Sequence, residues 1–217
     1  MDIIYNPLRT QLISDAIRLK IPCVNGLSML VAQAKYACDI FKNQKTTDEK
    51  IDVIVKAIES QVKNIILIGM PGSGKSHIGS LLAKSLGRPF VDSDNIITER
   101  AGNIETIFAQ HGEDYFREIE TEVLKEISKQ SGQIISTGGG CVTKDINFDL
   151  LHQNGVVIWL KRDIKLLPTN GRPLSKSGSL NEMYLKRAPL YEKFADFIID
   201  NNLTPEETVN KIKECLN

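Results

Sequence analysis

Residues 69–76 read Gly69-Met70-Pro71-Gly72-Ser73-Gly74-Lys75-Ser76, which is the pattern GxxxxGK[ST]. The glycines let backbone N–H groups turn toward phosphate oxygens, because a Cβ would obstruct that approach. An apolar run precedes the stretch and a helical pattern follows it, so the positive end of the helix is directed at the same place. We therefore predict nucleotide phosphate binding here, through Gly72, Ser73, Gly74, Lys75, Ser76 and His77.

Within this loop two side chains have their own expected tasks. The Lys75 ammonium supplies a point charge for the β- and γ-phosphates, and the Ser76 hydroxyl can bind Mg²⁺ directly. We therefore expect ATP and Mg²⁺ as cofactors.

The composition of the whole chain limits its partners. The 217 residues suffice for one substantial core plus an additional segment. Because 27 basic and 27 acidic residues cancel, we expect no nucleic acid and no membrane partner. No apolar stretch approaches the roughly 20 residues that span a bilayer, and the start is not a signal peptide. We expect a cytoplasmic protein whose cysteines, without a CxxC pair, are small buried hydrophobes: Cys23, Cys38, Cys141 and Cys215.

After about residue 62, short β-branched apolar runs alternate with helical patterns. The candidate strands are 64–70, 88–94, 132–140, 156–162 and 194–200. The candidate helices are 75–87, 95–101, 113–130, 144–153, 179–192 and 205–216. This alternation predicts an α/β domain over 63–217, with a parallel sheet covered on both faces and right-handed crossovers.

In residues 1–62 the apolar residues follow helical spacing without strand-like runs, and this segment is predicted to form a helical appendage. Helical spacing of apolar residues runs through 7–20 and 25–41, with Asn25-Gly26 as the break. A third helix is expected from Thr46, which has capping-box spacing to Glu49.

Two carboxylates end the second candidate strand, in Phe90-Val91-Asp92-Ser93-Asp94. Positions two apart lie on one face of an extended chain, so Asp92 and Asp94 can both line the ligand edge of the sheet. We expect Asp92 to hold the water shell of Mg²⁺. Asp94 would accept hydrogen bonds from a polyhydroxy substrate and orient or deprotonate its hydroxyl. The alternative is a solvated turn in which Asp94 caps the next helix.

Two arginines and a glycine turn are further candidates. Arg117 lies between acidic residues on a helix, where the alternative is a surface ion pair. Gly138-Gly139-Gly140 exposes backbone amides at a strand end, and the alternative there is a flexible turn. Arg187 ends a helix, where an arginine can also interact with the helix terminus.

Together these stretches carry a resemblance. Six motifs stand in the order and at nearly the spacing of shikimate kinases: GMPGSGKS, FVDSD, IFAQHGEDYFREIE, STGGG, GRPL and RAPLYEKFAD. The chain therefore resembles that family over about residues 62–217. The resemblance implies the three-layer fold of nucleoside monophosphate kinases, with five parallel strands. It also implies transfer of phosphate from Mg²⁺-ATP to the 3-hydroxyl of shikimate, in aromatic amino acid biosynthesis.

The family's site residues carry over onto matching positions. Two arginines would clamp the shikimate carboxylate, because guanidinium is suited to bidentate recognition. The shikimate-binding residues implied are Asp94, Arg117, Gly139 and Arg187, with Phe108 and Phe116 as an apolar wall.

The resemblance also assigns a mobile lid. Arg172 corresponds to the lid arginine that reaches the transferring phosphate, so the implied catalytic residues are Lys75, Asp94 and Arg172. The stretch 161–171 is shorter than the family's lid. The family's second lid-side arginine has no clear counterpart in it, and Arg162 or Lys165 is a candidate substitute.

About residues 1–45 resemble the C-terminal end of shikimate dehydrogenase, through YNPLRT, the NGLSML run and Gln33. In that family the matching glutamine contacts shikimate. A complete dehydrogenase is excluded, because the chain has no GxGxxG fingerprint and no substrate domain. The segment is expected to pack on the kinase or on a partner from the same pathway.

Two other functions remain open at this stage. Another small-molecule kinase, such as a gluconate kinase, would use the same scaffold but without the full set of acceptor residues. A nucleotide-binding module without turnover is the alternative from a different class. We expect shikimate as the small-molecule substrate and a monomer.

Overall fold

The computed structural model describes residues 1–167 and 180–216. The chain divides into two compact units, Met1–Lys63 and Asn64–Asn217, each described here by itself.

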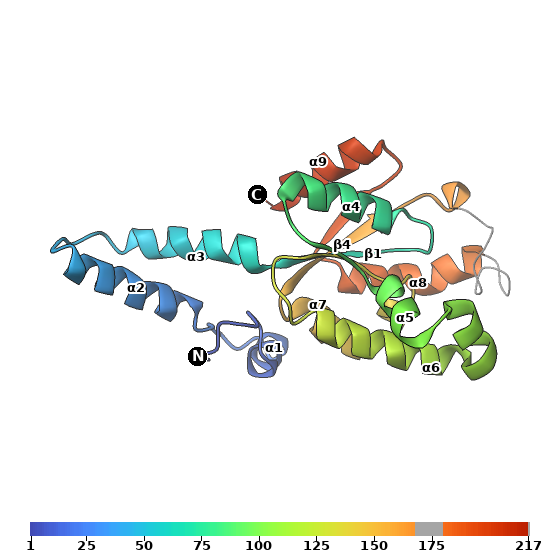
Figure 1. The fold of residues 1–217 in the computed structure, drawn as a ribbon, viewed down its shortest axis with the longest axis horizontal. Helices are drawn as coiled ribbons and strands as arrows, with labels where there is room; N and C mark the ends of the chain where they lie inside the picture. Colours follow the sequence, from blue (N-terminus) through green and yellow to red (C-terminus); the bar gives the residue numbers. More distant parts are fainter. Residues whose placement is uncertain (168–179, 217) are drawn as a thin grey trace. The chain divides into compact units, whose positions relative to one another are not determined.

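The second unit is built on a five-stranded parallel sheet in the order β2-β3-β1-β4-β5 (Figure 1). The strands are β1 Asn64–Ile68, β2 Phe90–Asp92, β3 Ile134–Ser136, β4 Gly155–Lys161 and β5 Phe197–Asp200. The predicted α/β architecture is confirmed. Strands β1 and β3 end earlier than the apolar runs predicted, because the chain leaves the sheet before the glycines that follow each of them.

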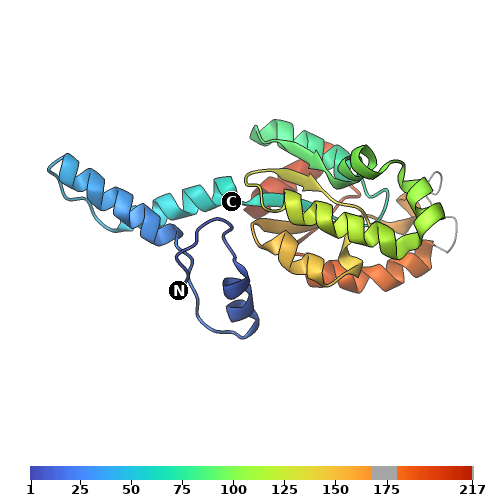
Figure 2. The same cartoon turned by 60° about the horizontal axis from the view of Figure 1, so that its bottom comes forward.

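Helices cover both faces of this sheet. The helices are α4 Lys75–Leu86, α5 Ser93–Ala101, α6 Ile104–Ile127, α7 Ile146–His152, α8 Leu180–Phe194 and α9 Pro205–Leu216, with short 3₁₀ turns η1 Cys141–Thr143 and η2 Ile164–Leu166. Helices α4 and α9 lie on one face, and the remaining α-helices of the unit lie on the other (Figure 1). Figure 2 shows α6 running along the sheet, with α7 and α8 beside it.

Strand β1 shows how the sequence divides the core between these faces. Its five residues are all buried, as expected for a central parallel strand. Ile65 and Leu67 pack with α4 and α9, whereas Ile66 and Ile68 pack with the helices of the opposite face. Alternation of side chains along the strand therefore supplies two hydrophobic clusters from one short apolar run.

The first unit contains α1 Gln11–Arg18, α2 Leu27–Phe41 and α3 Glu49–Val62. Helices α2 and α3 lie side by side, where Leu27 and Val31 pack against Ile51 and Val55 (Figure 1). Within 1–167 and 180–216, no helix combines the length and the apolar character needed to cross a membrane.

The predicted capping box at the start of α3 is wrong. The N-cap is Asp48, whose side chain makes no capping hydrogen bond. The Thr46 hydroxyl instead donates to the Asp39 carboxylate at 3.0 Å, and the Thr46 carbonyl accepts from Lys35 at 2.8 Å. Thr46 therefore contacts α2, although the local spacing predicted it as the cap of α3.

The cysteine prediction holds only in part. All four cysteines are free, and Cys141 is buried. Cys38 is exposed on α2, so it does not serve as a core hydrophobe in this unit.

Candidate active site

The phosphate loop follows β1 and leads into α4. Gly69, Gly72 and Gly74 have φ values of 146°, 82° and 90°, a region that L side chains rarely adopt. Gly74 immediately precedes α4. Lys75 is buried, and its Nζ donates to the Gly69 and Met70 carbonyls, both at 3.0 Å. The loop therefore curves around the ammonium group, as a phosphate cradle requires.

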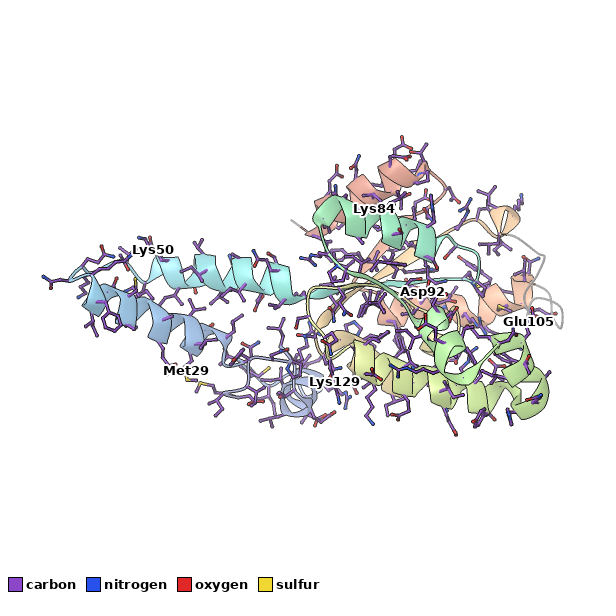
Figure 3. The ribbon with its side chains drawn as sticks, viewed as in Figure 1. Met29, Lys50, Lys84, Asp92, Glu105 and Lys129 are labelled. Carbon is purple, nitrogen blue, oxygen red and sulfur yellow. The ribbon has the colours of Figure 1, made fainter. Side chains whose placement is uncertain are left out.

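The carboxyl end of β2 meets the loop at Ser76. The Ser76 Oγ donates to Asp92 Oδ2 at 2.6 Å and lies 3.3 Å from the Ser136 Oγ at the end of β3. Asp92 is at the junction of β2 and α5, facing the start of α4 (Figure 3). These oxygens are hard donors of the kind that Mg²⁺ accepts.

Asp94 lies inside the site and is not the cap of α5. The cap is Asp92, whose Oδ1 accepts from the Asp94 N–H at 3.0 Å. This arrangement directs the Asp94 side chain toward Gly138, where Asp94 Oδ1 would lie 2.8 Å from an added Cβ. The solvated-turn alternative for Asp94 is therefore wrong.

Arg117 is buried rather than exposed on its helix. Its Nη1 pairs with Glu120 at 2.7 Å and its Nη2 with Glu113 at 2.9 Å. Burial opposes the charged form of Arg117, and the two carboxylates outweigh that effect, so the pKa of the guanidinium is raised. The surface-pair alternative is wrong, because one partner, Glu120, is fully buried.

Glu120 is the residue that sequence reasoning missed. Its Oε1 is buried without a hydrogen-bond partner in the part of the chain described. Burial raises the pKa of this carboxyl, Arg117 opposes the rise, and the nearby Asp94 carboxylate adds to it. The spacing of three residues from Arg117 was a signal for contact on one helix face. The burial of Glu120, however, results from packing against other elements, which this spacing does not predict.

Gly139 joins the phosphate loop to α8. An added Cβ would lie 2.7 Å from the Pro71 ring, so only glycine allows this approach. The Gly139 carbonyl accepts from Arg187 Nη1 at 3.2 Å and from the Tyr191 hydroxyl. Arg187 is buried inside α8, which continues to Phe194, so it does not cap a helix end.

The two predicted clamp arginines face a common carboxylate. Glu113 Oε1 lies 2.9 Å from Arg117 Nη2 and 4.0 Å from Arg187 Nη2. The geometry of the pair therefore already accommodates one carboxylate oxygen between two guanidiniums.

These groups line one cavity of about 500 Å³. Its lining includes nearly all of the predicted site residues: Gly72, Gly74, Lys75, Ser76, His77, Asp94, Arg117, Gly139 and Arg187. Phe108 and Phe116 also line it, with ring centroids 4.6 Å apart. Ser73 is a buried residue of the loop itself, and Asp92 accepts a hydrogen bond from Ser76, which lines the cavity. Arg172, the GRPL motif and the rest of 168–179 lie outside the described residues.

The sequence of the chain is similar to that of known proteins over the unit that contains this cavity. The family model described as shikimate kinase matches residues 71–217. A shikimate kinase of Clostridium botulinum (strain Eklund 17B / Type B) is 41% identical over 158 residues, covering 70% of this chain and 96% of that protein. One from Thermodesulfovibrio yellowstonii is 44% identical over 162 residues, covering 70% and 93%.

Solved structures agree with the sequence matches. Shikimate kinase from Acinetobacter baumannii, solved in complex with shikimate, superposes with a TM-score of 0.66 at 31% identity, covering 74% of this chain and 96% of that one. The Aquifex aeolicus enzyme gives a TM-score of 0.64 at 35% identity, covering 70% and 95%. The family model and the curated relatives thus account for the second unit, and the chain belongs to the shikimate kinase family.

Proposed function

We propose that residues 63–217 form a kinase domain that transfers the terminal phosphate of ATP to the 3-hydroxyl of shikimate, giving ADP and 3-phosphoshikimate. The chain is a shikimate kinase, an ATP- and Mg²⁺-dependent phosphotransferase of aromatic amino acid biosynthesis. One observation carries the assignment of roles: the phosphate loop, Asp94 and two arginines line a single cavity.

The nucleotide side of the cavity is assigned to the phosphate loop. Backbone N–H groups of Gly72, Ser73 and Gly74 would surround the phosphates, with Lys75 as the neutralising cation. His77 would contribute its backbone from the first turn of α4, where the helix dipole favours an anion. Arg172 would add a cation at the transferring phosphate, where charge spreads in the transition state.

The metal site is assigned to Ser76 and Asp92. No group of three or more His, Cys, Asp or Glu side chains gathers into a metal cage within 1–167 and 180–216. Mg²⁺ usually keeps several waters and takes one or two protein oxygens besides substrate phosphates. The Ser76 hydroxyl and, through water, Asp92 fit that demand. Bound there, Mg²⁺ would neutralise charge on the β- and γ-phosphates.

The acceptor side is assigned to Asp94, Arg117, Gly139 and Arg187. The guanidiniums would hold the shikimate carboxylate at the position that Glu113 now approaches. Asp94 would accept a hydrogen bond from the ring hydroxyls and take the proton of the attacking one. Phe108 and Phe116 would cover the apolar side of the ring. Catalysis then consists of positioning and electrostatic stabilisation.

A coupled ADP-release assay with Mg²⁺-ATP tests this proposal, comparing shikimate, quinate and gluconate as acceptors. We expect release that depends on shikimate. Release with gluconate alone would assign a different acceptor. ATP binding without release for any acceptor would favour a nucleotide-binding module that does not turn over.

Residues 1–62 we assign to a separate helical domain that descends from the C-terminal end of shikimate dehydrogenase. Support comes from the NGLSML run and Gln33, which is exposed on α2. Large exposed hydrophobic side chains on this unit suit a protein partner, and we propose an enzyme of the same pathway. We further propose a cytoplasmic monomer in the absence of that partner. Sedimentation of the pure chain tests whether it is a monomer, and sedimentation of a mixture with such enzymes tests the proposed partner.

A further inference from the structure

Arg162 lies beside the phosphate loop, although it is distant from that loop in the sequence. It follows β4 directly, and β4 is hydrogen-bonded to β1 in parallel with Ile68 opposite Trp159. The loops after both strands therefore leave the sheet at the same edge. As a result, Arg162 Nη1 lies 3.6 Å from the position of a Cβ on Gly74.

The end of β5 completes this edge. Lys161 of β4 pairs with Asp200 of β5, and the next residue, Asn201, donates its side-chain N–H to the Ser73 carbonyl. Asn201 Nδ2 and Arg162 Nη1 approach Gly74 together. Two donor-bearing side chains, from the residues that follow neighbouring strands, thus lie next to the phosphate loop at Gly74.

Arg162 forms no ion pair within residues 1–167 and 180–216, whereas three other arginines of this unit each have an anionic partner. Arg100 pairs with Glu126, Arg117 with Glu113 and Glu120, and Arg187 approaches Glu113. Arg162 Nε is buried, and no hydrogen-bond partner for it occurs among residues 1–167 and 180–216. A partly buried guanidinium without a counter-charge is costly unless an anion completes it.

We propose that Arg162 binds a phosphate group of the nucleotide at the Gly74 end of the loop, in addition to Lys75. The inference rests on the proposed nucleotide binding by residues 69–76. Lys75 is held inside the loop by the Gly69 and Met70 carbonyls. Arg162 reaches the same loop at Gly74 from the end of β4, so a second cation lies next to the loop. A planar guanidinium can donate two hydrogen bonds to one phosphate.

The structure favours Arg162 over Lys165 for this task. Lys165 lies in η2 and is exposed, and its backbone N–H donates to Asp163. Lys165 therefore serves as a matched control, because it is a cation three residues away without a position at the loop.

The test is isothermal titration of the full chain with ADP and, separately, with inorganic tripolyphosphate. Arg162→Gln and Arg162→Met both remove the charge, and the methionine keeps an apolar stem. We expect each to weaken binding of both ligands roughly 10- to 100-fold, the range for one charge-assisted hydrogen bond. We expect Lys165→Gln to change either affinity by less than about twofold.

Two outcomes would overturn the proposal. Unchanged ADP affinity in both Arg162 variants would remove Arg162 from the nucleotide site. Loss of ADP affinity with unchanged tripolyphosphate affinity would assign Arg162 to the nucleoside instead of the phosphates. The shikimate-dependent ADP release of the unaltered chain reports separately on the proposed function. Tripolyphosphate binding still tests Arg162 if that release is absent.

Discussion

Asp94 and Lys75 lie in one cavity but serve different halves of the proposed reaction. Asp94 lies beside Gly138 and Glu120 on the acceptor side, and Lys75 lies within the phosphate loop. We expect Asp94→Asn to lower shikimate-dependent ADP release about 10²- to 10⁴-fold, because the amide cannot take a proton from the hydroxyl. ADP affinity should remain almost unchanged.

The assay and an ADP titration on the same variant separate these effects. Asp114→Asn is the matched control, because Asp114 is an exposed carboxylate on α6. An equal loss of ADP binding in Asp94→Asn would contradict the role assigned to Asp94.

Cys141 differs from Cys38 in reactivity for a physical reason. Burial raises the pKa of the Cys141 thiol to about 12. The thiolate is the reactive form, so at pH 8 an aromatic disulfide reagent should modify exposed Cys38 and leave Cys141 unmodified until the chain unfolds. Cys38→Ser should abolish this fast phase. Fast modification that persists in Cys38→Ser and is lost in Cys141→Ala would contradict the burial of Cys141.

The raised pKa of Cys141 also makes the stability of the fold depend on pH. The folded pKa of Cys141 is raised above its ordinary value of 9.0, so above that pH the unfolded chain loses this proton first. Stability from Cys141 is therefore present below about pH 9 and is lost as the pH rises toward 12. Cys141→Ala should reduce the fall in the free energy of unfolding between pH 8 and pH 10, measured by urea titration.

At the scale of elements, the phosphate loop and the glycine turn after β3 depend on each other. A Cβ on Gly139 would lie 2.7 Å from the Pro71 ring and 2.9 Å from the Pro71 nitrogen. We expect Gly139→Ala to lower the free energy of unfolding by about 1–3 kcal/mol, because backbone must shift. It should also weaken ADP binding, since Pro71 is part of the loop.

Urea titration and ADP calorimetry measure both effects. Lys84→Ala is the control, because Lys84 is exposed on α4, where Figure 3 labels it. Stability and ADP affinity equal to those of the unaltered chain would show that the two loops move independently.

The sequence predicted those elements that depend on short-range patterns of residues, such as apolar runs and glycines. The apolar runs located all five strands, and the glycines located the turns at the carboxyl edge. The predicted helix from residue 113 matches the part of α6 after Gly112, whose φ of 83° and ψ of 179° interrupt the helix, but the part before Gly112 was not predicted. The structure begins it at Ile104, after Asn103, whose side chain accepts from the Glu105 and Thr106 N–H groups. That cap was readable from the sequence, since asparagine is a strong N-cap residue.

Long-range contacts decided the remaining features, and the sequence does not display them. Thr46 had capping-box spacing, yet the Asp39 carboxylate of α2 binds it. A surface ion pair was the alternative for Arg117, yet packing buries its partner Glu120 near Asp94. The motifs predict the acceptor residues, whereas the place of Arg162 at the loop follows from the register of β4 with β1.

At the scale of the whole molecule, the two units have separate hydrophobic cores in the part of the chain that the structure describes. The clusters beneath the sheet faces use residues from Ile65 onward, and the α2–α3 cluster uses residues up to Val62. Large exposed hydrophobic side chains also mark the first unit, where Ile40 is 78% and Phe41 is 90% exposed. The kinase unit should therefore fold without residues 1–60.

A chain starting at Gln61 is expected to release ADP with the same dependence on shikimate as the full chain, and to unfold in one cooperative transition. It should also bind less of the dye ANS, because the exposed apolar side chains of α2 are gone. The kinase assay, urea titration and dye fluorescence measure these three quantities. Double substitution of Ile40 and Phe41 by Ser in the full chain is the control for the dye. If the shortened chain bound ADP normally but required far more shikimate, residues 1–60 would contribute to the acceptor site, and Gln33 would be the first residue to substitute.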